Sequence, residues 1–146
     1  ANHKGAAFVE ILQNCNVYND LAWNILYDRE SKVAHELRLD HGKPLFFGPV
    51  DDRCALVLEG IRPQVVKAKG LPESARWMHD ETDSEAALVL AQLPNPEFPI
   101  ATGVLLSTEA PVYEEILVEQ ERKAIADWGP GEIEKLLRSG DTWKVG

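Results

Sequence analysis

The chain has 146 residues, of which 45% are hydrophobic, and its formal net charge is −9. This length and apolar content are enough for one ordinary domain with its own core. The excess of acidic side chains excludes nucleic acid as the main partner, because the phosphate backbone would repel it. No apolar run approaches the roughly 20 residues that a membrane-spanning helix needs. We therefore expect a cytoplasmic protein with no nucleic-acid and no membrane partner.

The first predicted elements are a helix end and a strand. Residues 1–5 place His and Lys before a Gly, which is typical of the last turn of a helix. We therefore expect that the chain begins inside a domain; the alternative is a short disordered N-terminus. The apolar run over residues 7–13 predicts a buried strand.

A polar group follows this strand directly, with the order amide, amide, thiol, amide from Gln13 to Asn16. In open α/β sheets, ligands bind at the carboxyl ends of the strands, so these side chains are candidates for a ligand-facing or subunit-facing edge. The alternative is that the amides only cap neighbouring loops. Residues 14–49 are irregular apart from a helical patch over 21–27, and segments of this kind are usually functional or wrap a partner.

Short strands and turns are predicted in the middle of the chain. Residues 35–39 alternate as in a strand, and residues 45–47 form a second apolar strand. Residues 40–44 between them predict a turn, although His41 and Lys43 could instead offer positive charge to an anionic ligand.

A β-hairpin is predicted next, followed by alternating helices and strands. Its strands cover residues 54–58 and 64–68, with a loop over 59–63. The next elements expected from capping residues and breakers are a short strand at 76–79 and a helix that begins with a Ser or Thr N-cap in 82–85 and ends near 93. They are followed by a strand at 99–106, a long acidic helix at 113–126 with Pro111 as its first residue, and a short helix at 132–138. This order supports an α/β or α+β fold.

Catalytic and metal-binding signatures are absent from the sequence. It has no G-x-S-x-G, no Walker A, no G-x-G-x-x-G and no H-E-x-x-H motif. Two cysteines, Cys15 and Cys54, cannot complete a four-cysteine cluster or zinc site, and the four histidines show no ligand spacing. We predict no catalytic residue and no metal site in this chain alone. A cysteine-dependent enzyme would need a partner such as His41 for Cys15, and would lower the pKa of that thiol.

Four segments of the chain together resemble a known family. They are residues 3–20 (HKGAAFVEILQNCNVYND), 39–45 (LDHGKPL), 119–120 (EQ) and 136–143 (LLRSGDTW). Their order and spacing resemble the C-terminal part of the β subunit of 2-oxoacid:ferredoxin oxidoreductases, and the 2-oxoglutarate branch in particular. The likeness covers essentially the whole chain and is loose between residues 51 and 93.

The resemblance implies a fold and a set of cofactors. It implies an α/β (or α+β) fragment, in which residues 1–20 end a thiamine-diphosphate-binding domain with its last strand. Residues 21–146 would form a C-terminal extension with a β-hairpin and two to three helices. In the family, the β subunit carries thiamine diphosphate, Mg²⁺ and a [4Fe-4S] cluster. This chain has no Gly-Asp-Gly motif for the diphosphate. The cluster cysteines are expected upstream, so Cys15 is not assigned as a ligand, and no cofactor is expected to be fully ligated here.

The resemblance also implies an activity, partners and cofactor-proximal residues. The full enzyme would oxidatively decarboxylate a 2-oxoacid, 2-oxoglutarate in the first place, to an acyl-CoA and pass electrons to ferredoxin. The partners would be the upstream part of the β subunit, the α subunit, ferredoxin, coenzyme A and the 2-oxoacid, and the segment alone would be inactive. The alternative function is a free-standing, non-enzymatic acidic interaction module. The residues expected near the cofactor are Gln13, Asn14, Cys15, Asn16 and Asn19.

Overall fold

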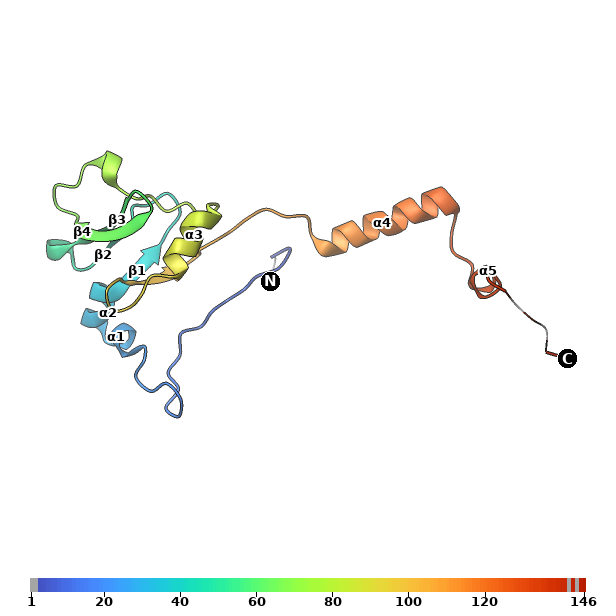
Figure 1. The fold of residues 1–146 in the computed structure, drawn as a ribbon, viewed down its shortest axis with the longest axis horizontal. Coiled ribbons are helices and arrows are strands. Elements are labelled where there is room, and N and C mark those ends of the chain that lie inside the picture. Colours follow the sequence, from blue (N-terminus) through green and yellow to red (C-terminus); the bar gives the residue numbers. More distant parts are fainter. Residues whose placement is uncertain (1–2, 142, 144) are drawn as a thin grey trace. The chain divides into compact units, whose positions relative to one another are not determined.

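The computed structural model describes residues 3–141, 143, 145 and 146 (Figure 1). The helices in this part of the chain are α1 (Asn24–Tyr27), α2 (Arg29–His35), α3 (Ser84–Ala91), α4 (Tyr113–Trp128) and α5 (Ile133–Leu137). The strands are β1 (Glu36–Leu39), β2 (Phe46–Phe47), β3 (Cys54–Glu59), β4 (Arg62–Lys67) and β5 (Ile100–Gly103). The mixture of helices with two small sheets confirms the predicted α/β or α+β class.

The chain divides into two compact units. Glu10–Thr108 forms one unit and contains both sheets, whereas the other unit combines the N-terminal residues up to Val9 with Glu109–Gly146.

The first sheet of Glu10–Thr108 is a parallel pair of strands, β1 and β5, in which Leu37 faces Ala101 and Leu39 faces Gly103. Gly103 has a φ of +112°, and a Cβ at this position would lie 2.7 Å from the backbone oxygen of Leu39. Only glycine therefore allows the two backbones to approach this closely at the end of β5.

The second sheet is antiparallel, with the order β2-β3-β4. It confirms the predicted hairpin but corrects its loop, because Glu59 pairs with Arg62 and only two residues connect the strands. Gly60 begins this connection with a φ of +64°, as a type II′ hairpin turn requires. The predicted loop was too long, since Arg62 and Pro63 belong to β4. Pro63 lies on the edge strand β4 and pairs with Leu58 of β3. A proline is tolerated on an edge strand because its missing N–H removes no hydrogen bond from the interior of the sheet.

A single leucine-rich cluster forms the core of this unit. Its buried members come from β1, β3, α3 and the residue before β2: Leu37, Leu39, Leu45, Leu56 and Leu90. Partly buried side chains surround them: Phe47, Trp77, Leu93, Phe98, Ala101 and Leu105. The strands predicted at residues 35–39 and 45–47 supply three of the five buried leucines, and the alternation at 35–39 identified the buried side of that strand correctly.

Two helices of this unit differ from the prediction at their starts. α3 is capped by Asp83, whose side chain accepts from the backbone N–H groups of Glu85 (2.9 Å) and Ala86 (3.0 Å), and not by a Ser or Thr. α2 lies inside the segment predicted to be irregular and is capped by Asp28, which accepts from the Ser31 N–H at 2.9 Å. An aspartate cap was overlooked in both cases.

The predicted strand over residues 7–13 is not formed. These residues pair with no strand in the described part of the chain, and the side chains of Phe8 and Ile11 are 93% and 75% exposed. A strand is stable only with neighbours that satisfy its backbone groups, and none is present here. The strand predicted at 76–79 is likewise reduced to one bridge, between Pro44 and Met78.

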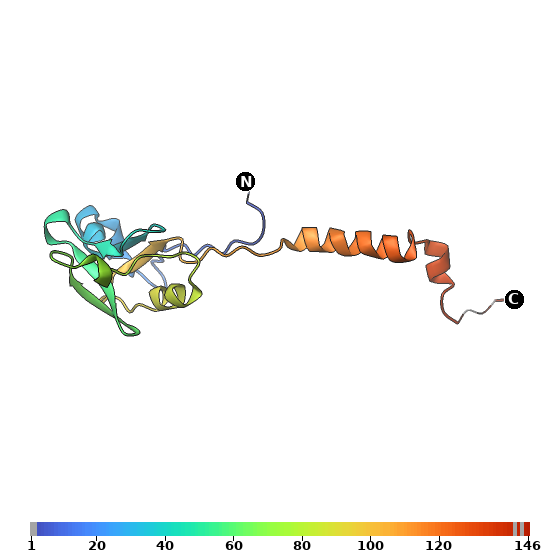
Figure 2. The same cartoon turned by 90° about the horizontal axis from the view of Figure 1, so that it is seen from above.

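The unit that contains Glu109–Gly146 carries the two C-terminal helices. α4 is one continuous helix (Figure 2), and it starts two residues after Pro111, which is therefore not its first residue as predicted. Neither α4 nor α5 has a buried residue. Their apolar side chains consequently contribute to no core among the described residues.

Candidate functional site

Residues 14–21 form a closed loop that contains most of the predicted cofactor-proximal residues. The Asn14 side chain closes it, since its Nδ2 donates to Asp20 Oδ1 at 2.9 Å and its Oδ1 accepts from the Leu21 N–H at 2.7 Å. Within the loop, the Asn19 N–H donates to the Cys15 carbonyl at 2.9 Å. The structure thus brings Asn14, Cys15 and Asn19 together.

The other two predicted residues, Gln13 and Asn16, lie next to this loop but take no part in closing it. Both are exposed, and neither side chain forms a hydrogen bond in the described part of the chain. The sequence pattern had no signal for Asp20 or Leu21, whose roles depend on the turn between them and Asn14.

Leu21 adopts a left-handed backbone conformation with a φ of +61°. A leucine in this region is strained, and such strain persists only where surrounding contacts hold it. The hydrogen bond from the Leu21 N–H to Asn14 is such a contact. The loop is therefore fixed by its polar residues and not by a hydrophobic core.

The Cys15 thiol faces backbone N–H groups of its own loop. Those of Tyr18 and Val17, and to a smaller extent that of Asn19, lower the pKa of the Cys15 thiol, while burial acts in the opposite direction. Cys54, by contrast, donates its thiol proton to the Asp52 carbonyl, with Sγ and O 3.8 Å apart.

A Cys15–His41 pair finds no support in these contacts. The His41 Nδ1 lies 3.8 Å from Asp80 Oδ1 and accepts from the Glu81 N–H at 3.3 Å. The polar contacts of Cys15 stay within its own loop. Cys15 can act as a thiolate, but no general base is placed beside it among the described residues.

The predicted turn at residues 40–44 is confirmed and rests on a buried histidine. The Gly42 N–H donates to the His79 carbonyl, and the His79 N–H donates to the Lys43 carbonyl, both at 2.8 Å. The His79 ring is 2% exposed, and its Nε2 lies 2.8 Å from the Val104 carbonyl oxygen. Residues 37 positions apart are joined here, which no local pattern in the sequence could indicate.

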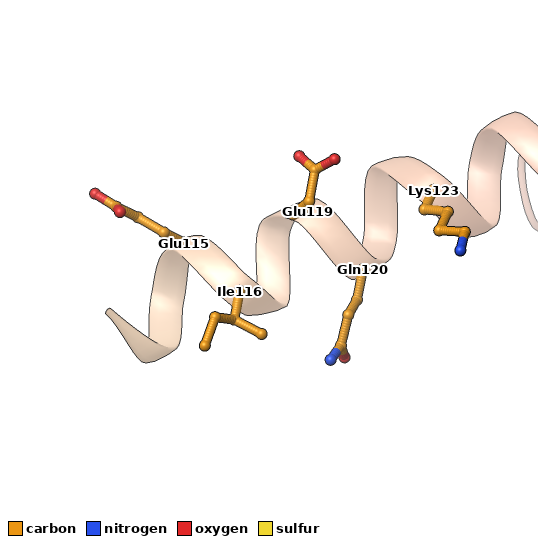
Figure 3. A pocket seen from close by; sticks show the side chains of 5 residues that line it. All are labelled: Glu115, Ile116, Glu119, Gln120 and Lys123. Carbon is orange, nitrogen blue, oxygen red and sulfur yellow. The ribbon is translucent and has the colours of Figure 1, made fainter. Parts of the chain in front are cut away.

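Metal sites and hollows give no further candidate for chemistry. In the ranges 3–141, 143 and 145–146, no group of three His, Cys, Asp or Glu side chains is placed to hold a metal ion. A surface hollow on α4 is lined by one helix alone, through Glu115, Ile116, Glu119, Gln120 and Lys123 (Figure 3). No helix in the described part of the chain combines the length and apolar character needed to cross a membrane.

One curated protein matches the chain over nearly its whole length. The chain is 30% identical over 150 aligned positions to the 2-oxoglutarate oxidoreductase subunit KorB of Mycobacterium tuberculosis (strain ATCC 25618 / H37Rv). The alignment covers 99% of this chain and 40% of that protein. No family model and no solved structure matches the chain. The likeness to KorB confirms the resemblance inferred from the four sequence segments.

Proposed function

We propose that this chain, whose sequence is that of a KorB-like β subunit, is part of a 2-oxoacid:ferredoxin oxidoreductase. The observation that carries the proposal is the match to KorB over 99% of the chain. The enzyme would oxidatively decarboxylate a 2-oxoacid, with 2-oxoglutarate as the first candidate, to an acyl-CoA and would reduce ferredoxin. Its other partners would be an α subunit and the rest of the β subunit, and the complex would be cytoplasmic.

Thiamine diphosphate supplies the carbon nucleophile for this class of reaction when it is bound. The described residues include no group suited to hold the Mg²⁺ of its diphosphate, and the sequence has no Gly-Asp-Gly motif. The cofactor would therefore be held by other parts of the β subunit. In this proposal, residues 1–20 complete the thiamine domain and residues 21–146 form the extension that follows it.

The loop of residues 14–21 is proposed to line the approach to the cofactors, with Asn14 and Asn19 fixing its shape and Gln13 and Asn16 exposed beside it. For Cys15 we propose a role that differs from the expectation that every cluster cysteine lies upstream. Backbone N–H groups directed at a cysteine sulfur are a feature of iron–sulfur sites, where they stabilise the thiolate and tune the cluster. Cys15 fits a cluster ligand in this respect, whereas the Cys54 thiol is directed at the Asp52 carbonyl oxygen. A cluster would need its remaining thiolates from elsewhere in the subunit.

The iron content of the full β subunit tests this role of Cys15. We expect Cys15→Ala to lower the iron-to-protein ratio and the visible absorbance of the anaerobically purified subunit, because one of four ligands is lost. Cys54→Ala is the matched control and should leave both unchanged. An unaltered iron content in Cys15→Ala would contradict the ligand role without touching the proposed activity.

The activity is tested with the complete enzyme. The full β subunit, co-expressed with its α subunit, should reduce ferredoxin only when 2-oxoglutarate and coenzyme A are both present. The chain of 146 residues alone should not. Absence of turnover with 2-oxoglutarate and with other 2-oxoacids would contradict the proposal and favour the alternative, a non-enzymatic acidic interaction module.

A further inference from the structure

The helix α4 carries apolar side chains that no described residue covers. Tyr113, Leu117 and Trp128 are 72%, 50% and 86% exposed, and Val118 and Ile125 are 44% and 45% exposed. At 100° per residue, Tyr113, Leu117 and Trp128 form one row along the helix, and Val118 and Ile125 form a second row. An isolated helix of this length is marginally stable in water, so packing against another surface would stabilise it.

Two carboxylates lie between these apolar rows. Glu114 and Glu121 are seven residues apart, which places them on the same side of α4, about 10 Å from one another along the axis. Neither forms an ion pair in the part of the chain that the structure describes. Two other acids of α4 do, since Glu115 lies 3.1 Å from Lys4 and Glu119 lies 3.9 Å from Arg122.

Figure 3 shows where the paired acids lie. Glu115 and Glu119 point away from the side on which Ile116 and Gln120 lie. At 100° per residue, Glu115 and Glu119 are turned by about 100–160° around the helix from Glu114 and Glu121, which lie between the two apolar rows. We call the surface made of the two apolar rows and these two carboxylates the docking face: Tyr113, Glu114, Leu117, Val118, Glu121, Ile125 and Trp128.

We propose that the docking face of α4 binds an apolar groove on a different protein subunit, and that two arginine or lysine side chains in this groove pair with Glu114 and Glu121. Burying a carboxylate in an apolar interface is costly unless a cation and hydrogen bonds compensate it. The partner must supply these cations, because neither basic residue of α4 pairs with Glu114 or Glu121 among the described residues. Arg122 lies 3.9 Å from Glu119, and Lys123 lies on the opposite side of the helix.

The same charges argue against two other occupants. In a dimer through this face, Glu114 and Glu121 would meet the identical carboxylates of a second copy, and like charges in a desolvated contact are repulsive. An anionic membrane surface attracts helices with basic polar faces, and a face with two central carboxylates has the opposite charge. The proposal rests on the proposed function in one respect, since the α subunit of the oxidoreductase is taken as the partner.

Charge reversal in the full β subunit, co-expressed with the α subunit, tests the proposal. The double variant Glu114→Lys/Glu121→Lys should weaken the complex at least about tenfold, as for truncated buried charge pairs. The matched control Glu115→Lys/Glu119→Lys changes the net charge equally on the same helix and should stay within about twofold. The fraction of complex is measured by mass photometry upon dilution, after circular dichroism has verified folding. Equal weakening by both variants, or none by either, would overturn the proposal.

A photo-crosslinking amino acid at position 117 gives a second, independent readout. A crosslink to the α subunit supports the proposal, and a crosslink to a second β subunit or within the same chain overturns it. Turnover with 2-oxoglutarate is recorded for the same samples. A complex that depends on Glu114 and Glu121 but has no turnover would contradict only the proposed function, and turnover without this dependence would contradict only the docking face.

Discussion

The strands of the unit Glu10–Thr108 and the helix α4 contain similar apolar residues, but these residues are buried in the strands and exposed on the helix. Leu37 on β1 is completely buried, whereas Leu117 on α4 is 50% exposed. β1 pairs with β5, and its leucines pack with buried leucines of β3 and α3, so they belong to a core. α4 has no such neighbours among the described residues. Apolar side chains therefore indicate a core only when the topology supplies a second layer.

The largest effect expected from this comparison is on the free energy of unfolding. Leu37→Ala should lower it by about 2–5 kcal/mol, because it leaves a cavity in the leucine cluster. Leu117→Ala should change it by about 0.5 kcal/mol or less, because an exposed side chain loses few contacts. Urea denaturation of this chain measures both. Similar costs for the two variants would show that α4 is packed as well as β1 is.

The close approach of β1 and β5 at Gly103 allows a second test of how tightly this unit is packed. Gly103→Ala should lower the free energy of unfolding by about 1–3 kcal/mol for its left-handed backbone alone, and by more because the new Cβ meets the Leu39 carbonyl oxygen. The control is Gly70→Ala, which has a φ of +82° but no atom within 4 Å of the added Cβ. Thermal unfolding should separate the two. A smaller loss for Gly103→Ala than for Gly70→Ala would contradict the close approach.

Cys15 also allows a test of chemical reactivity. The lowered pKa of Cys15 implies a larger thiolate fraction at pH 7 than for an ordinary thiol, and only the thiolate reacts with iodoacetamide. We expect Cys15, measured in the Cys54→Ala variant, to react several-fold faster at pH 7 than the thiol of an unfolded reference peptide with one cysteine. The pH profile of Cys15 should have the lower midpoint of the two. Identical profiles would remove the support for a thiolate in this loop.

The smallest effect concerns Asp80, beside the buried His79. The Thr82 hydroxyl (2.7 Å) and the Thr82 N–H (2.9 Å) donate to Asp80 Oδ1 and lower the pKa of this carboxyl, with a smaller contribution from His41. Since the folded state favours the carboxylate, its contribution to stability is present above the ordinary pKa near 4 and is lost as the pH falls through the lower folded value.

Nuclear magnetic resonance titration of the Asp80 carboxyl checks this direction. Thr82→Ala should move the pKa of Asp80 up toward its ordinary value, because the hydroxyl donor is removed. Thr108→Ala, which alters no contact of Asp80, is the control. A pKa of Asp80 that is ordinary in the unaltered chain would contradict the hydrogen bonds from Thr82.

The sequence was informative where the periodicity is local and less so where distant residues meet. The alternation at residues 35–39 and the hairpin at 54–67 were predictable, because neighbouring residues determine them. The pairing of β1 with β5 and the support of the 40–44 turn by His79 were not, because no local pattern encodes contacts between residues so far apart.

The candidate site was predictable in its position but not in its structure. The polar run from Gln13 to Asn16 identified the segment, but a strand was expected before it and the closed loop was not. The loop depends on Asp20 and on a left-handed Leu21, a conformation that sequence statistics disfavour for leucine. The run of apolar residues before Gln13 has strand character, but the neighbours that would pair with it are not among the described residues.

The parallel pair of β1 and β5 has a consequence for how the chain folds during synthesis. The side chains of Glu36 and Thr102, which share a hydrogen bond of 2.8 Å across this pair, are 66 positions apart in the sequence. The hairpin of β3 and β4 can form as soon as Lys67 has left the ribosome, whereas β1 has to wait for β5. Contacts of such long range form slowly. For this interval Leu37 and Leu39 lack the cover of β5 in the nascent chain, and β1 is therefore a segment that a chaperone would protect.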